Sequence, residues 1–350
     1  MSNLIKISSC FLLLVFMIQA CQNQGKKEQN TSTEFQFKEK LSDYGFFKGK
    51  LSELNPNPEL ISYDLSSALF SDYAIKDRFI VLPEGSKMKY VDNEELEFPD
   101  STIIIKNFAY RNSNDEKIMI ETRLLVKDPS DHNWKVMNYL WDEKQDDAVK
   151  FIRGVVLPIS LKDDAGNLHK TNYMVPNTND CKRCHIKDSK LLPIGPKARN
   201  MNFTRAGQTE NQLVWLAKEG HLENLPDLQQ VQALPNWLDK ANFNLEQRAR
   251  AYLDINCSHC HRRGGDAFNT GLFLEYTEMD TVRLGYHKGP VSAGAGAGGL
   301  DFDLVPGSPD KSILYYRMNS TEPGTAMPEL ARSMIHTEGV ELIKDWIKHL

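Results

Sequence analysis

Two copies of Cys-x-x-Cys-His are the residues in this chain best suited to do chemistry. Together they comprise Cys181, Cys184, His185, Cys257, Cys260 and His261. Within each copy the two cysteines fall on one face of a helical turn, so both thiols can add to the two vinyl groups of one haem. The imidazole that follows can then bind the iron as its proximal ligand. We therefore predict two covalently bound haem c groups, with His185 and His261 as proximal ligands.

Other uses of these cysteines fit the pattern less well. A zinc site made of all four cysteines would join pairs that are far apart in sequence, and zinc gives no reason for a histidine after each pair. A thioredoxin-like redox pair requires a βαβ setting, and neither motif follows a strand and opens a long amphipathic helix. A disulfide within either pair would close almost no loop. Haem attachment is the interpretation that uses all six residues.

The distal ligand of the second haem is predicted to be Met327, in the proline-bracketed segment PGTAMPEL. The alternative is a core methionine, which we expect Met318 and Met334 to be, because each can join an apolar helical face. Ligation by histidine and methionine raises the reduction potential and leaves no open position for a substrate. The second haem is therefore expected to pass single electrons.

The distal ligand of the first haem is less well defined. Met201, in PIGPKARNMN, is the only methionine between the two motifs, and His221 is its rival. Each has an alternative interpretation, as a packed methionine and as a surface histidine. An open sixth position would make the first haem a reaction centre instead of an electron carrier.

The second motif is expected to end a helix. Asn244 and Gln247 form an approximate capping box, and apolar residues then recur at helical spacing up to Cys257. A second apolar helical stripe lies near the C-terminus, at Val340, Ile343, Ile347 and Leu350. Two terminal helices packed around a haem are typical of small c-type cytochromes, so residues 244–350 are predicted to form such a domain.

The first motif follows a strand and a turn, with no helix leading into Cys181. A later helix is predicted from a capping box at Thr209 and Gln212, with Gly220 as its stop. Residues 179–243 are therefore expected to be a first, truncated haem c region.

Residues 46–178 are predicted to be β-rich. Turn clusters recur every ten to fifteen residues, and residues 118–127 alternate as a half-buried strand does. The expected architecture is multidomain, with an N-terminal all-β, sandwich-like domain followed by mainly α cytochrome c-type haem domains. Trp134, Tyr139 and Trp141 could stack on a sugar or belong to the core.

The N-terminus has the pattern of an export signal. Lys6 precedes an apolar run at residues 11–18, and Ile18-Gln19-Ala20-Cys21 resembles the lipobox of bacterial lipoproteins. We predict a lipoprotein signal peptide at residues 1–20, lipidation of Cys21 that anchors the chain in a lipid bilayer, and a flexible tether at residues 21–45. A plain signal peptide cut elsewhere is the alternative. The expected location is the periplasmic side of the bacterial cell envelope, with Gln22 favouring the outer membrane.

Composition excludes some partners. The 350 residues are 41% hydrophobic and 25% charged, with a net charge of −5, as in an ordinary soluble protein. Since no strongly basic field exists, we expect no nucleic-acid partner. The glycine-rich run at residues 294–299 matches a dinucleotide-binding pattern, but no buried strand precedes it and it is expected to be a loop.

Several blocks of the sequence resemble a family of bacterial di-haem c-type cytochromes that are often encoded beside a parallel β-helix protein. They are VPNTNDCKRCH, PIGPKARN, RARAYLDINCSHCHRRGG and MPELARSMIHTEGVELIKDWI, with ALFSDYAIKDRFIVLPEG and IETRLLVKD upstream. The resemblance implies haem attachment at the four cysteines, His185 and His261 as proximal ligands, and Met327 distal to the second haem. It implies no distal ligand for the first haem and no physiological reaction.

Three functions follow as expectations. The first is electron transfer between an envelope redox partner and the respiratory chain. The second is a haem enzyme, a peroxidase or substrate dehydrogenase, with the first haem as reaction centre and the β domain binding substrate. In the third, the β domain docks the cytochrome onto a carbohydrate or a protein partner such as a parallel β-helix protein.

Overall fold

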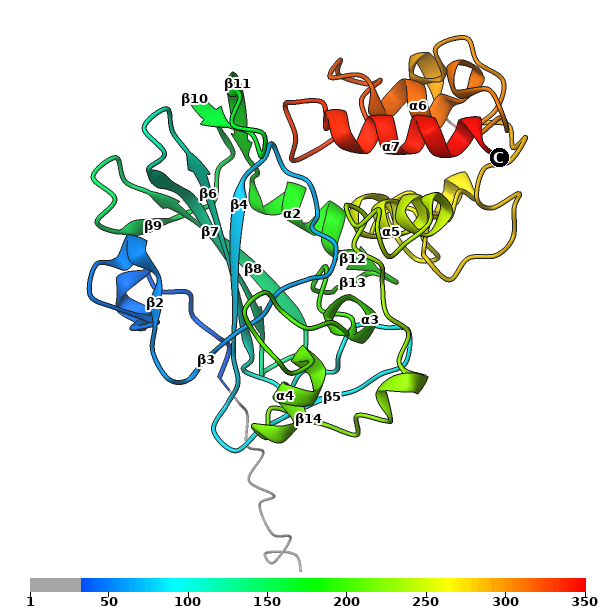
Figure 1. Cartoon of the computed structure of the whole chain (residues 1–350). Helices are drawn as coiled ribbons and strands as arrows, with labels where there is room; N and C mark the ends of the chain where they lie inside the picture. The colour runs from blue at the N-terminus through cyan, green and yellow to red at the C-terminus, as the bar shows by residue number, and fades with distance from the viewer. Residues whose placement is uncertain (1–32, 292) are drawn as a thin grey trace, which may run out of the picture. The chain divides into compact units, whose positions relative to one another are not determined.

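A six-stranded antiparallel sheet occupies the N-terminal half of the chain. The computed structural model describes residues 33–291 and 293–350. In spatial order the strands are β3 (Leu60–Ser62), β4 (Ile75–Val81), β6 (Ile103–Arg111), β7 (Lys117–Lys127), β8 (Trp134–Trp141) and β9 (Ala148–Phe151). The strand expected from the alternation at residues 118–127 is β7. Helices lie mostly in the C-terminal part, so the fold is mixed α/β with a large antiparallel sheet (Figure 1).

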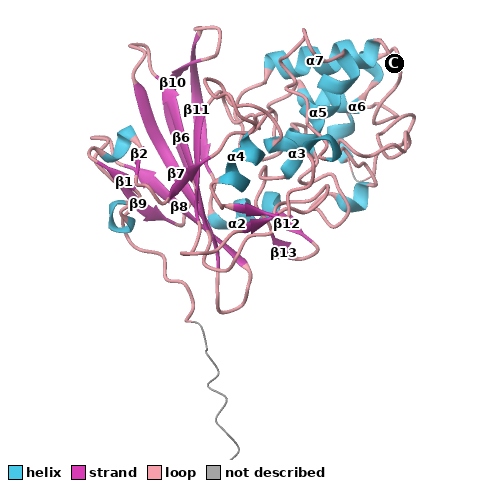
Figure 2. Ribbon diagram, turned by 60° about the horizontal axis from the view of Figure 1, so that its bottom comes forward, coloured by secondary structure: helices cyan, strands magenta, loops and turns pink. Residues whose placement is uncertain are grey.

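Shorter elements surround this sheet. The remaining strands are β1 (Phe47–Lys48), β2 (Asn55–Pro56), β5 (Met88–Lys89), β10 (Val155–Lys162), β11 (Leu168–Val175), β12 (Ile186–Lys187), β13 (Lys190–Leu191) and β14 (Leu222–Glu223). The helices are α2 (Thr178–His185), α3 (Ala198–Met201), α4 (Gln212–Lys218), α5 (Leu245–Cys257), α6 (Ile313–Met318) and α7 (Thr337–Lys348). In both ribbon views the strands of the large sheet and helices α5 to α7 lie on opposite sides of the unit formed by residues 35–350 (Figure 2).

One face of the sheet is covered by the residues that precede β3. Leu41, Phe46 and Phe47 are buried against Ile105 and Leu124 of the sheet. The tether predicted at residues 21–45 is therefore wrong from Phe35 onward, because apolar side chains there pack on the sheet. Residues 21–32, with Cys21, and the predicted signal peptide lie outside the described residues.

The other face of the sheet is covered by residues of the predicted first haem region. Ile80, Ile104 and Leu125 pack against Leu213 and Leu216 of α4. The sheet and residues 179–243 therefore share one core, and the layers that cover the sheet are short helices and hairpins.

The large aromatic side chains of the sheet are interior. Trp134, Tyr139 and Trp141 are 6%, 0% and 7% exposed. Of the two interpretations of these aromatic residues, the core is therefore confirmed, and a sugar cannot reach their faces.

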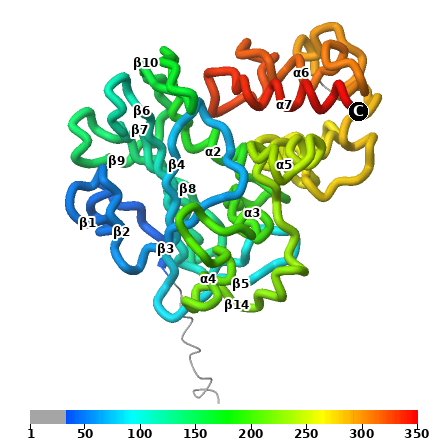
Figure 3. The backbone as a smooth tube through the Cα atoms, viewed as in Figure 1, coloured from blue at the N-terminus to red at the C-terminus, as the bar shows by residue number. Residues whose placement is uncertain are grey.

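Helices α5 and α7 form the core of the C-terminal part. The capping box at Asn244 and Gln247 is present at the start of α5, as predicted. Tyr252 and Leu253 of α5 pack against Val340 and Ile343 of α7. The tube view shows the two helices side by side although they are far apart in sequence (Figure 3).

Helix α4 begins at a different cap from the one predicted. Its N-cap is Asn211, whose side chain accepts a hydrogen bond from the backbone NH of Leu213, so the Thr209 box is wrong by two residues. Across the described residues, none of the helices has the length and hydropathy to cross a bilayer.

Candidate functional site

The first motif lies on a short helix that begins just before it. Asn177 caps α2 by accepting hydrogen bonds from the NH groups of Asn179 and Asp180, and the Asp180 carboxylate accepts one from the Asn177 NH. The cap places Cys181 and Cys184 one turn apart on α2. Cys181 is buried against the sheet, with its Sγ 3.7 Å from Oδ1 of Asn138 on β8.

His185 is oriented as a metal-binding histidine is. Its Nδ1 lies 2.7 Å from the carbonyl oxygen of Leu192 and donates to it, which leaves the lone pair on Nε2 available. Burial lowers the pKa of His185 to about 4, so the imidazole is neutral near pH 7. A neutral ring with its Nδ1 fixed by a backbone carbonyl fits the proximal ligand of a haem iron.

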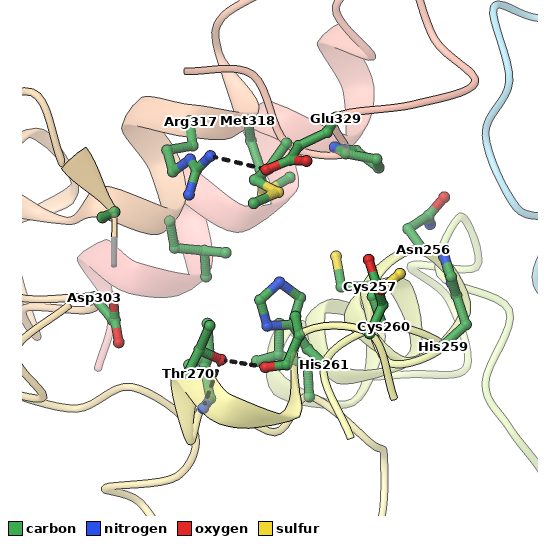
Figure 4. Close-up of a pocket in the computed structure, with 18 of the residues that line it drawn as sticks. Asn256, Cys257, His259, Cys260, His261, Thr270, Asp303, Arg317, Met318 and Glu329 are labelled. Atoms are coloured by element: carbon green, nitrogen blue, oxygen red, sulfur yellow. Dashed lines mark hydrogen bonds and ion pairs between the residues drawn. The ribbon is translucent and has the colours of Figure 1, made fainter. Parts of the chain in front are cut away.

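The second motif continues the last turn of α5. Cys257 ends the helix, and its carbonyl accepts hydrogen bonds from the NH groups of Cys260 and His261. Burial lowers the pKa of His261 to about 4, which keeps this imidazole neutral as well. Figure 4 shows the ring pointing into a cavity, with Met318 on the opposite wall.

This cavity has a volume of about 280 Å³, close to the lower end of the range of about 300–1,000 Å³ for small-molecule sites. Its lining includes Cys184, Cys257, Cys260, His261, Met318 and Met327. Met327 therefore lies at the cavity into which His261 points. Met318, expected to be a core methionine, is buried in the core with α5 and α7 but also borders the cavity.

The two motifs meet at their second cysteines. Ligand atoms of Cys184, His259 and Cys260 all lie within 4.8 Å of one another. The hydrogen bond between Cys184 and Cys260 lowers the pKa of the Cys184 thiol and raises that of the Cys260 thiol, and a hydrogen bond with His259 lowers the pKa of Cys184 further. Cys181 lies instead in the sheet core and Cys257 in the α5–α7 core. A single zinc site made of all four cysteines is thus not assembled, although these three side chains could hold a metal ion.

The segment that carries Met327 is fixed from two sides. The Asp72 carboxylate accepts hydrogen bonds from the NH and hydroxyl of Ser333 and from the NH of Met334. On the other side, Glu329 forms an ion pair with Arg183 of α2 at 3.1 Å. Asp72 and its neighbour Tyr73 have positive φ angles, the kind of backbone strain that tertiary contacts must hold in place. Sequence analysis missed Asp72, because no local pattern marks it.

Met201 and His221 lie away from this cavity. Met201 is fully buried at the end of α3, in the core that α4 and the sheet share. His221 is half-buried beside Trp215, and its carbonyl accepts a hydrogen bond from the NH of Met88. Met201 is placed as a packed methionine is. That Met201 or His221 is the distal ligand of the first haem iron remains a prediction.

A buried network of charges joins the sheet side of the site to α5. Arg199 of α3 pairs with Asp254 at 2.7 Å, with both side chains 2% exposed. Arg262, directly after the second motif, pairs with Glu95 at 2.9 Å. These contacts join α5 and the end of the second motif to α3 and to the segment at Glu95.

Comparison with known proteins gives no assignment: no protein-family model, curated protein or solved structure matches this chain.

Proposed function

We propose that the chain is a di-haem c-type cytochrome that transfers electrons in the bacterial cell envelope, related to the cytochromes whose sequence blocks it resembles. The observation that carries this proposal is the pair of neutral, half-buried imidazoles, each directly after two cysteines on a helical turn. When bound, the two haem groups would supply reversible one-electron chemistry.

In this proposal the residues of the two motifs and Met327 have the following roles in binding haem. Cys181 and Cys184 would hold one haem and Cys257 and Cys260 the other, with His185 and His261 as ligands of the two irons. Met327 would be the other protein ligand of the second iron. The closeness of Cys184 to Cys260 brings the two attachment sites together, which favours electron transfer between them. In the proposed fold, residues 46–178 form the β-rich domain, residues 179–243 the first haem c region and residues 244–350 the cytochrome c domain with the second haem.

The proposed cellular setting follows from the N-terminal pattern. Acylation of Cys21 would hold the protein on the periplasmic side of a membrane, with the outer membrane favoured, near an envelope redox partner.

A second candidate is a haem enzyme, such as a peroxidase or a substrate dehydrogenase. It is favoured by the burial of Met201 in the apolar core, which leaves the first iron without an obvious methionine ligand. In that case the first haem would be the reaction centre and the second its electron relay.

Absorption spectra of the oxidised and reduced holoprotein separate these functions. Electron transfer predicts two low-spin haems, with a sulfur-to-iron charge-transfer band from the second. One high-spin haem that binds cyanide or reacts with peroxide would contradict the simple carrier and favour the enzyme.

A further inference from the structure

A row of positive side chains crosses the sheet face on which α2 packs. Arg78 on β4, Lys106 on β6 and Arg123 on β7 are direct cross-strand partners, and Asn138 on β8 ends the row. Like charges placed directly opposite each other in a sheet are destabilising. The row therefore costs stability unless something neutralises it.

The neighbouring positions show how unusual this row is. Two residues further along the strands, the same face carries Ile80, Ile104, Leu125 and Val136, all of which are buried in the apolar core. On the other side of the row lie Phe108 and the smaller apolar cluster around it. Three cations thus stand between two apolar clusters on one covered face.

The protein neutralises only part of this charge. Glu121 pairs with Arg123 through both of its oxygens, at 2.5 and 3.0 Å. Arg78 is 8% exposed, its Nη1 donates to the Lys76 carbonyl, and its Nη2 is buried without a hydrogen-bond partner. Within residues 33–291 and 293–350, neither Arg78 nor Lys106 has an ion pair.

The nearest acids are already engaged. Asp64 accepts from Arg205 at 2.7 Å, and Asp77 from Lys117 at 2.7 Å. Lys76, two residues before Arg78 on the same face of β4, adds another positive charge. Burial and the neighbouring cations lower the pKa of Lys106 well below its usual value, and an arginine cannot shed its charge in this way.

The row faces the first haem-attachment motif. Cys181 of α2 contacts Asn138 at the end of the row, and Asn138 is the cross-strand partner of Arg123. A group held by Cys181, Cys184 and His185 would therefore lie against these cations.

We propose that Arg78 and Lys106, together with Arg123, form a carboxylate-binding site next to the first haem-attachment motif. This proposal rests on the proposed function. Guanidinium groups bind carboxylates through two parallel hydrogen bonds, and the free Nη2 of Arg78 provides a donor for this. The carboxylate comes either from the propionate groups of the first haem or from a small carboxylate molecule that binds beside it.

The test uses the full holoprotein and paired variants. Arg78→Gln and Lys106→Gln remove charge, whereas Arg78→Lys and Lys106→Arg retain it. Arg111→Gln is the control, since Arg111 is an exposed cation on the same strand as Lys106. Haem content is measured first: fewer than two haems in the wild type would contradict the proposed function and not the site.

Three readouts follow on samples with two haems: the midpoint potential of the first haem, the propionate bending band in its resonance Raman spectrum, and absorbance titration with succinate at constant ionic strength. If the propionates occupy the site, the Gln variants lower the potential and shift the Raman band, while succinate has no effect on the wild type. If a small carboxylate binds, succinate causes a saturable change that weakens at least tenfold in the Gln variants. The charge-retaining variants Arg78→Lys and Lys106→Arg should stay close to the wild type in whichever of these measurements the Gln variants change.

An unchanged propionate band in the Gln variants, together with no saturable response to succinate in the wild type, would overturn the proposal. The same conclusion would follow if Arg111→Gln caused effects as large as those of Lys106→Gln.

Discussion

The two Cys-x-x-Cys-His motifs have the same chemistry but different surroundings. The second ends the thirteen-residue helix α5, packs with α7, and faces a cavity bordered by two methionines. The first lies on the eight-residue helix α2, against a sheet face with three neighbouring cations. In the proposed function the motif would determine attachment and the proximal ligand, and the comparison teaches that the surrounding elements would determine which other side chains approach each iron. We therefore expect the second haem to be a closed electron carrier and the first to be the more responsive to charge and added ligands.

The largest expected effect on stability comes from removing the buried ion pair between α3 and α5. Asp254→Asn leaves the buried Arg199 guanidinium without its partner, and breaking a buried ion pair in this way costs roughly 3–5 kcal/mol. Urea unfolding should show that decrease in the free energy of unfolding. Glu341→Gln removes an exposed pair and should change stability by less than about 1 kcal/mol. Equal effects from the two variants would show that the buried pair does not join the regions.

Removing Met327 should make the two haem sites more alike. Met327→Ala is expected to lower the midpoint potential of the second haem by on the order of 0.1 V, a fraction of the roughly 0.8 V range that ligands and surroundings set. It should also let cyanide bind there. Redox titration checks this, with Met334→Ala as the control because Met334 does not border the cavity. If only Met318→Ala has these effects, Met318 is the ligand.

His336, directly before α7, should make the free energy of unfolding depend on pH. His336 stacks on Phe70, and burial, with the charges of Lys76 and Arg332, lowers its pKa from 6.5 to about 3. Between these values the unfolded chain binds the proton and the folded chain does not, so stability falls as the pH falls from about 6.5. The slope should approach about 1.4 kcal/mol per pH unit.

His336→Gln should remove this part of the slope in urea unfolding at several pH values. His349→Gln, which removes an exposed histidine, should leave the slope as it is. A slope that is the same in the His336 variant and the wild type would show that another group takes up the proton.

The smallest effect is expected at the crossing of α5 and α7. A Cβ on Gly339 would overlap the Tyr252 ring, so Gly339→Ala requires the ring or the helices to shift. Overpacking costs about 1–3 kcal/mol, while the better helix propensity of alanine returns up to about 1 kcal/mol, so a net loss should remain. Thermal unfolding checks the sign. The potential of the second haem should change more than that of the first, and the reverse would contradict the separation of the two regions.

Local patterns were sufficient for the elements that carry the second motif. The reciprocal cap at Asn244 and Gln247 and the apolar spacing before Cys257 predicted α5, and the alternation at residues 118–127 predicted β7. Such signals are contained in a few neighbouring residues, which is why sequence alone could identify them.

Other features depend on partners that are distant in sequence. The approach of Cys184 to Cys260, the bonds from Asp72 to Ser333, and the cross-strand row at Lys106 exist only once the chain is folded. Two errors had local causes. The polar run after Cys21 was extended into residues 35–45, although Phe35, Phe37 and Leu41 are apolar there. At α4, Thr209 and Asn211 are both residue types that cap helices well, and the local sequence does not distinguish them. In the folded chain Asn211 is the N-cap.

Haem content per chain tests the central claim most directly. The mature chain, produced in a host that matures c-type cytochromes, would be measured by pyridine haemochrome absorbance and intact mass, beside variants in which the cysteines of one motif are replaced by serine. We predict two covalent haems in the wild type and one in each variant. A wild-type chain with fewer than two haems, or with zinc held by Cys184, His259 and Cys260, would contradict the account.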